Sequence, residues 1–150
     1  MNKDQITADS AKLTLSKILT LFNEASNNGY LNHHSYESIF LDAELKNKNC
    51  MYQLKYFLSI IMTVPAYFYN AMGYPLYKGN SFDAVRSEYN FDLEILDKAS
   101  LIRKRWPEKE KHPYLNNKVP VWVEDILAPA FFERAVKYVE QFVMEIERSG

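Results

Sequence analysis

The sequence predicts an all-α fold, an up-and-down bundle of four long helices that forms a single domain over residues 1–150. The chain contains only 4 glycines and 6 prolines, too few turn residues for a sandwich or barrel of many short strands. Four segments carry apolar residues at spacings of three and four, which is the pattern of a helix with one buried face. Four such helices in a small chain bury these faces best against each other.

The first helix is predicted from an apolar stripe that starts at Ala11. Asp9 or Ser10 can cap its start, because their side chains accept hydrogen bonds from free backbone N–H groups. The turn from Asn27 to Gly29 ends it, since these residues tolerate the left-handed conformation. Residues 30–42 show no clear long-range period and are interpreted as a connection.

The second helix is predicted to start near Ala43, and it is apolar almost all round from Tyr56 onward, which is typical of a buried helix. No charged residue lies between Lys55 and Lys78. This uncharged stretch is long enough that it also suits a membrane span. Polar and turn residues interrupt this stretch, and no other segment could pair with it in a membrane. A central bundle helix with a kink at Pro65 is therefore favoured, and no membrane partner is predicted.

The third helix is predicted after a loop that begins at Gly73 to Pro75, with Ser81 as its cap. Its apolar stripe contains Val85, Tyr89, Leu93, Leu96 and Ala99. Acidic residues occupy its first two thirds and residues 103–105 are basic, a charge order that complements the helix dipole. The helix should end just before Pro107, and residues 107–119 should form a polar loop.

The last helix has the cleanest stripe in the sequence, from Phe132 to Ile146, and Pro129 suits its first turn. Residues 119–127 contain an apolar cluster just before it. This cluster is predicted to form either a short lead-in helix or an extended strap on the bundle.

The charge and the cysteine content limit the partners and the cellular location that are expected for the protein. The 18 Lys and Arg against 19 Asp and Glu give a net charge of -1, so any nucleic-acid partner must be met by a local patch. The single cysteine, Cys50, cannot form an internal disulfide and is expected to be a small buried hydrophobe. The polar start MNKDQITADS lacks the pattern of a signal peptide, so a cytoplasmic location is expected.

The densest cationic run is Ser100 to His112, with five Lys or Arg against Glu108 and Glu110. It falls at a predicted helix end and the loop that follows. This pattern suits an anion or phosphate site, because Arg offers a planar fork of donors and His moves a proton near neutral pH. The alternative interpretation is a solvated helix end whose charges only match the helix dipole.

Arg105, six intervening residues and His112 lie between the third and last predicted helices. This arrangement resembles the Arg-x(4-6)-His motif of the HEPN superfamily. Pro113 and the amphipathic helix that follows are also similar to that family, whereas Trp106 stands where the family commonly has Asn or another polar residue. The resemblance implies a homodimer in which the motifs of two protomers meet and cleave RNA without a metal or another cofactor.

The resemblance implies a function and a set of site residues. The protein would be a HEPN-like RNA-cleaving or RNA-binding protein of a bacterial defence or toxin-antitoxin type system. Arg105 and His112 would be catalytic, in a metal-independent endoribonuclease. The residues expected to contact the RNA are Arg103, Lys104, Lys109 and Tyr114.

Two other function classes stay open. One is a non-catalytic helical module, such as an immunity or regulatory protein, that binds another protein through the acidic third helix. The other is a small-ligand binder that uses the aromatic residues from Tyr67 to Tyr77. His33 and His34, with Glu37 nearby, are interpreted as part of a surface loop, because adjacent histidines point differently, so no metal site is predicted.

Overall fold

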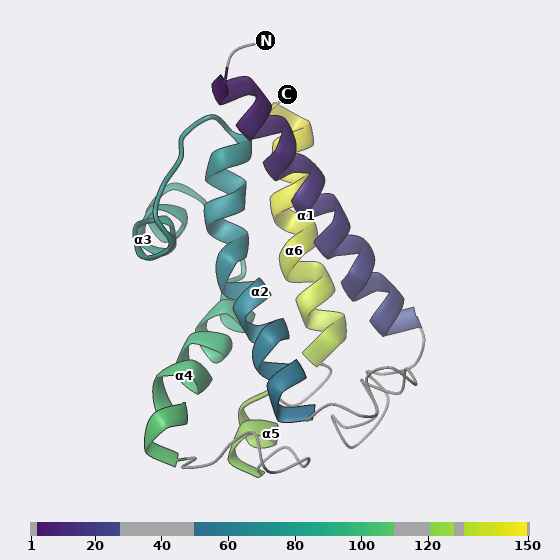
Figure 1. The fold of residues 1–150 in the computed structure, drawn as a ribbon, viewed down its shortest axis with the longest axis vertical. Helices are drawn as coiled ribbons and strands as arrows, with labels where there is room; N and C mark the ends of the chain where they lie inside the picture. Colours follow the sequence, from purple (N-terminus) through teal and green to yellow (C-terminus); the bar gives the residue numbers. More distant parts are fainter. Residues whose placement is uncertain (1–2, 28–49, 110–120, 128–130, 150) are drawn as a thin grey trace.

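The computed structural model describes residues 3–27, 50–109, 121–127 and 131–149. These residues form helices joined by short connections and contain no strand, which confirms the all-α class for this part of the chain. Figure 1 shows the helices α1 (Lys3–Asn27), α2 (Cys50–Ala71), α3 (Lys78–Glu88), α4 (Glu94–Lys109), α5 (Val121–Leu127) and α6 (Phe131–Ser149).

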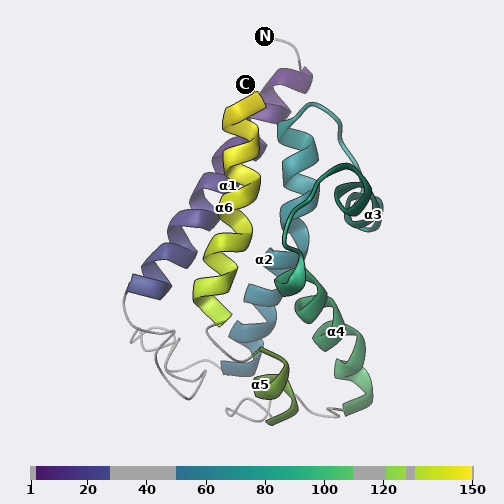
Figure 2. The ribbon, with the colours of Figure 1, turned by 180° about the vertical axis from the view of Figure 1, so that it is seen from behind.

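The helix α2 is central. It packs against α1, α3, α4 and α6, while α1 also packs along α6. Both ribbon views show α1 and α4 running in one direction and α2 and α6 in the other (Figures 1 and 2). The short helix α3 is seen nearly end-on in both views, so it crosses the direction of the long helices on the side of α2 where α4 also lies.

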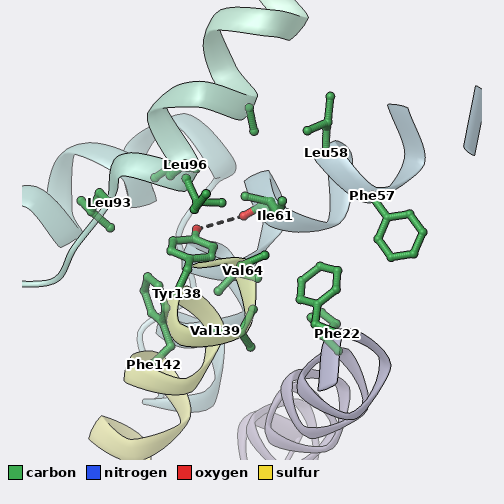
Figure 3. Packing of buried hydrophobic residues seen from close by; sticks show 14 of the residues in the cluster. Phe22, Phe57, Leu58, Ile61, Val64, Leu93, Leu96, Tyr138, Val139 and Phe142 are labelled. Atoms are coloured by element: carbon green, nitrogen blue, oxygen red, sulfur yellow. Dashed lines mark hydrogen bonds between the residues drawn. The ribbon is translucent and has the colours of Figure 1, made fainter. Parts of the chain in front are cut away.

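One continuous cluster of buried side chains joins α1, α2, α4, α5 and α6. Figure 3 shows part of it, with Phe22 of α1 beside Phe57 of α2 and with Tyr138 and Phe142 of α6 close to α2. The predicted stripe of α1 is confirmed, because its members from Ala11 to Phe22 face this core. The predicted burial of the second helix is also confirmed from Phe57 onward, where the buried apolar residues include Phe57, Leu58, Ile61, Val64, Phe68, Tyr69 and Ala71.

The start of α1 differs from the prediction. The helix begins at Lys3, and Asp9 and Ser10 are exposed residues within it rather than its cap. The reason is that the apolar stripe continues upstream to Ala8, which is buried, so the helix gains a further turn of core contact. The described part of α1 reaches Asn27, and the rest of the predicted terminating turn, Asn28 and Gly29, lies outside the described residues.

The end of α2 agrees with the prediction, and its start lies outside the described residues. Gly73 follows the last turn with φ of 88°, a left-handed conformation that glycine adopts without strain. The N–H of Tyr74 donates to the carbonyl oxygen of Tyr69 at 2.8 Å and closes the turn. The predicted start near Ala43 and the side chain of Cys50 lie outside the described part of the structure.

The predicted single third helix is wrong. It is divided into α3 and α4 by an extended segment of residues 89–93. In this segment Tyr89, Phe91 and Leu93 turn inward while Asn90 and Asp92 are exposed. The ring of Phe91 lies 5.8 Å from that of Phe68 and 4.8 Å from that of Phe142. An extended backbone places alternate residues on one side, so it buries Leu93 and partly buries Tyr89 and Phe91 within five residues.

The extended segment is held by hydrogen bonds that resemble those of a strand pair. Gln141 of α6 accepts a hydrogen bond from the N–H of Asp92 at 2.9 Å, and its amide donates to the carbonyl oxygen of Asp92 at 2.8 Å. The carboxylate of Asp92 also accepts from the N–H of Glu94 at 3.0 Å and covers the start of α4. Backbone groups released by the break in the helix thus find partners.

Both ends of the divided helix also differ from the prediction. Ser81 is not a cap but a fully buried residue inside α3, where its hydroxyl donates to the carbonyl oxygen of Lys78 at 2.6 Å. The helix α4 continues past Pro107 to Lys109, so residues 107–109 of the predicted loop are helical. Trp106 is buried against Trp122 of α5, and this packing holds the last turns of α4 despite the proline.

The structure decides between the two predictions for the segment before the last helix, a short lead-in helix or an extended strap. Residues Val121–Leu127 form the helix α5, so the short lead-in helix is correct and the extended strap is wrong. The core of α6 is built from Phe131, Ala135, Tyr138, Val139 and Phe142. The predicted stripe is therefore confirmed at Ala135, Val139 and Phe142, whereas Val136 and Val143 are only half-buried.

We expect Gln141→Glu to lower the free energy of unfolding by about 1–2 kcal/mol. A carboxylate cannot donate to the carbonyl oxygen of Asp92, so one of the two hydrogen bonds that hold the extended segment is lost. Urea denaturation followed by circular dichroism measures the change. The exposed neighbour Glu140 provides the control Glu140→Gln, and an equal effect of both substitutions would contradict the role of Gln141.

Candidate functional site

The predicted site residues fall at the end of α4 and in the chain that follows. Arg103, Lys104 and Arg105 occupy consecutive positions on α4, and Lys109 is its last residue. His112 and Tyr114 lie outside the described residues. The structure therefore shows where the basic residues of α4 lie. The convergence of Arg105 with His112 stays a prediction.

The three consecutive basic residues point in different directions, because successive residues of a helix are turned by about 100°. Lys104 and Arg105 are exposed, whereas Arg103 is half-buried against α2. Lys104 and Arg105 form no ion pair or hydrogen bond with any side chain that the structure describes, and the side chain of Glu108, one turn further along α4, lies outside that set. Their charges are thus open to solvent at one end of the molecule, where a polyanion can approach them.

Arg103 is positioned by the neighbouring helix. Its Nη1 atom donates a hydrogen bond to the hydroxyl oxygen of Ser59 in α2 at 2.8 Å. The charge of Arg103 also acts on Lys78 at the start of α3. Partial burial, with a further contribution from Arg103, lowers the pKa of the Lys78 ammonium below its ordinary value. Sequence reasoning missed the contact of Arg103 with Ser59, because the two residues lie 44 positions apart in the chain.

Trp106 anchors the end of α4. Its side chain is only 4% exposed, and its ring packs edge-to-face on Trp122 with a centroid distance of 6.2 Å. The indole N–H finds no hydrogen-bond partner among the described residues. Because Trp106 turns inward, the adjacent Arg105 is directed outward, and the tryptophan at this position is explained by packing on α5.

The acidic residues of the predicted third helix serve contacts within the chain. Glu88 accepts a hydrogen bond from Tyr69 at 3.0 Å, Glu94 pairs with Arg134, and Asp97 pairs with Arg86. The ion pair with Arg134 lowers the pKa of Glu94, and the hydrogen bond with Asp97 raises the pKa of Arg86. These three carboxylates link the elements around the break, while Gln141 of α6 binds the backbone of Asp92 and Asp83 is exposed.

The aromatic stretch from Tyr67 to Tyr77 is divided between core and surface. Phe68 and Tyr69 are buried, and burial together with the hydrogen bond to Glu88 raises the pKa of Tyr69. Tyr74 and Tyr77 are 70% and 86% exposed. An open pocket of about 460 Å³ lies beside the extended segment and is lined by Tyr89 and Phe91 but by no residue from 67 to 77. This stretch does not line that pocket, and its inner half belongs to the core.

The described residues contain neither a cluster suited to a metal ion nor a helix suited to a membrane span. Within the described ranges, no group of three or more His, Cys, Asp or Glu side chains is placed to hold a metal ion. His33, His34 and Glu37 lie outside those ranges. Among the described helices, including α2, none is long and apolar enough to cross a membrane.

Comparisons with known proteins found no match to this chain among protein-family models, curated proteins or solved structures. The fold and the site define an all-α protein with an exposed basic end of α4 beside a half-buried arginine. Its function is therefore argued from these residues.

Proposed function

We propose that this protein is a HEPN-like RNA-binding and RNA-cleaving protein that acts as a homodimer in a bacterial defence or toxin-antitoxin type system. The observation that carries the proposal is the pair Lys104 and Arg105, which are exposed near the end of α4. They lie immediately before the segment that contains His112. Arg provides bidentate donors for phosphate, so this surface suits the backbone of RNA.

The arrangement of the long helices also supports the proposal. The helices α1, α2, α4 and α6 alternate in direction along the chain, as the helices of an up-and-down bundle do (Figures 1 and 2). In this interpretation α4 is the third bundle helix, and α3 with residues 89–93 is an insertion between the second and third bundle helices that packs on α2 and α6. The proposed motif then starts at Arg105, in the last turns of the third bundle helix, and ends at His112, which precedes the last bundle helix in the sequence.

The proposed chemistry uses one acid-base group and one cation. His112 accepts the proton of the 2'-hydroxyl, the 2'-oxygen forms a bond to phosphorus, and the bond from phosphorus to the 5'-oxygen breaks, with a proton passing to the leaving oxygen. Arg105 holds the phosphate and offsets the charge that develops on it. Because two residues cannot surround a phosphodiester, the second protomer supplies the other acid-base group across a two-fold axis near residues 103–112.

We expect His112→Ala and Arg105→Ala each to remove most of the RNA cleavage activity in the presence of EDTA. Lys109→Ala should reduce it much less, because a charge at the helix end contributes mainly to encounter with RNA. The measurement is cleavage of single-stranded and structured RNAs by wild type and the three variants. Circular dichroism shows that each variant is folded, and light scattering at micromolar concentration should show a dimer.

Two outcomes would contradict the proposal. Cleavage that survives both His112→Ala and Arg105→Ala would exclude this pair as the catalytic site. A wild type that cleaves none of the RNAs would exclude a nuclease and favour the non-catalytic interaction module.

A further inference from the structure

Arg103 differs from most arginines of the chain in the kind of group that it binds. Three of the five arginines form ion pairs with carboxylates of their own chain: Arg86, Arg134 and Arg148. Arg103 is half-buried against α2, and its Nη1 atom donates instead to the neutral hydroxyl of Ser59 at 2.8 Å. No carboxylate among the described residues pairs with it. Its charge therefore stays available to an anion from outside the chain.

Ser59 also stands out in its own helix. Ser59 and Thr63 are the only polar residues from 57 to 64, and they lie four positions apart, on one face of α2. The hydroxyl of Thr63 donates to the carbonyl oxygen of Ile60 in the same helix at 2.7 Å. The hydroxyl oxygen of Ser59 instead accepts from Arg103, 44 positions away on α4, which packs on α2 (Figures 1 and 2). Ser59 thus holds the end of the Arg103 side chain from a different helix.

A guanidinium that is already held binds phosphate at a lower cost than a free one. The long side chain of an arginine loses rotamer freedom when an anion binds it, and this loss opposes binding. The hydrogen bond between Arg103 and Ser59 imposes part of this loss during folding, before a ligand binds. It uses one of the five N–H donors of the guanidinium, so other donors are left for the oxygens of a phosphate.

We propose that Ser59 is a positioning residue of the RNA site and that it acts through Arg103. Its hydroxyl orients the guanidinium so that Arg103 holds a second backbone phosphate of the RNA strand, separate from the one at Arg105. The inference rests on the proposed function for its ligand. Lys104 lies between Arg103 and Arg105 around α4, so a strand that crosses the helix reaches both arginines.

The test is binding of a 2'-O-methyl RNA oligonucleotide, which lacks the attacking hydroxyl, measured by fluorescence anisotropy at several salt concentrations. We expect Ser59→Ala to weaken binding about two- to tenfold at low salt, the cost of ordering one free arginine side chain. The slope of log affinity against log salt should stay at the wild-type value, because the substitution removes no charge. Ser59→Thr keeps the hydroxyl and should restore the wild-type affinity.

Arg103→Met identifies the residue through which Ser59 acts. It removes the charge and the donors, so binding should weaken and the salt slope should fall by about 0.7, the value for one single-strand phosphate contact. In this background Ser59→Ala should have no further effect. The matched control is Thr63→Ala, which removes a hydroxyl that binds its own helix and should keep the wild-type affinity. Melting curves confirm that each variant is folded.

The outcomes separate this inference from the proposed function. If Ser59→Ala weakens binding equally with and without Arg103, or if Thr63→Ala weakens it as much, Ser59 acts on the packing of α2 and the inference is wrong. The inference is also wrong if Ser59→Ala keeps the wild-type affinity, or if Arg103→Met keeps it while Arg105→Ala weakens binding. The proposed function stands in each of these cases. If wild type does not bind the oligonucleotide at low salt, both proposals are wrong.

Discussion

Phe142→Ala is expected to lower the free energy of unfolding by about 3–5 kcal/mol, as large aromatic deletions in a core do. The ring is fully buried at the centre of α6. It meets Phe68 of α2, Phe91 of the extended segment and Tyr138 of its own helix, at centroid distances of 5.2, 4.8 and 5.2 Å. Its removal leaves a cavity where three elements meet, so the neighbouring rings cannot all collapse into it.

Urea or thermal denaturation followed by circular dichroism measures this loss. Met144 stands on the same helix but is 59% exposed, so Met144→Ala should change the free energy of unfolding by less than about 0.5 kcal/mol. An unchanged melting temperature for Phe142→Ala would mean that this face of α6 is not in the core.

Tyr138→Phe is expected to lower the free energy of unfolding by about 1–3 kcal/mol, the cost of leaving a buried polar group without its partner. The hydroxyl of Tyr138 donates to the carbonyl oxygen of Ile61 in α2 at 3.0 Å, as Figure 3 shows. That carbonyl would normally accept from the N–H four residues later, but that residue is Pro65, which has none. Burial raises the pKa of Tyr138 well above its ordinary value, so the hydroxyl keeps the proton that it donates.

A double-mutant cycle tests this explanation. Pro65→Ala restores an N–H that can reach the carbonyl oxygen of Ile61, so Tyr138→Phe should cost clearly less in that background than in wild type. The comparison within the cycle cancels the separate effect of the proline on the unfolded chain. Equal costs of Tyr138→Phe in both backgrounds would show that the hydroxyl does not replace the missing N–H.

The parts of the fold that could be predicted are those in which one pattern dominates. The stripe of α6 and the apolar surface of α2 each match a helix and no other element, and the left-handed Gly73 marks an end. The end of α4 could not be predicted from Pro107, because the burial of Trp106 against α5 outweighs the local preference against a helix.

The division of the third helix was missed because two patterns overlap. Val85, Tyr89, Leu93 and Leu96 follow the period of a helix, whereas the sequence YNFDL from Tyr89 to Leu93 alternates as an extended strand does. Phe91 falls on the apolar side only in the alternating pattern. Its ring contacts aromatic rings of α2 and α6. The alternating pattern was visible in the sequence. Whether it prevails over the helical pattern depends on contacts with residues of α2 and α6, which are distant in the chain.

In the candidate site, too, features that depend on contacts between distant residues could not be predicted from the sequence. The basic run at residues 103–105 is local and could be found by reading the sequence, and the structure places it at a helix end. The hydrogen bond of Arg103 to Ser59 could not be found in this way, since it exists only after α4 has packed on α2. The part of the site that depends on tertiary contacts was therefore outside the reach of motif analysis.

The hydrogen bond between Tyr138 and Ile61 also determines how far α6 can slide along α2. Apolar contacts between two helices are nearly equivalent after a shift of one turn, about 5.4 Å, because the stripes repeat. Such a shift would bury the Tyr138 hydroxyl opposite a carbonyl that already has an N–H partner, and it would leave the Ile61 carbonyl with none. The proline and the tyrosine together thus select one axial register for the two helices, and that register sets the position of Gln141 opposite Asp92.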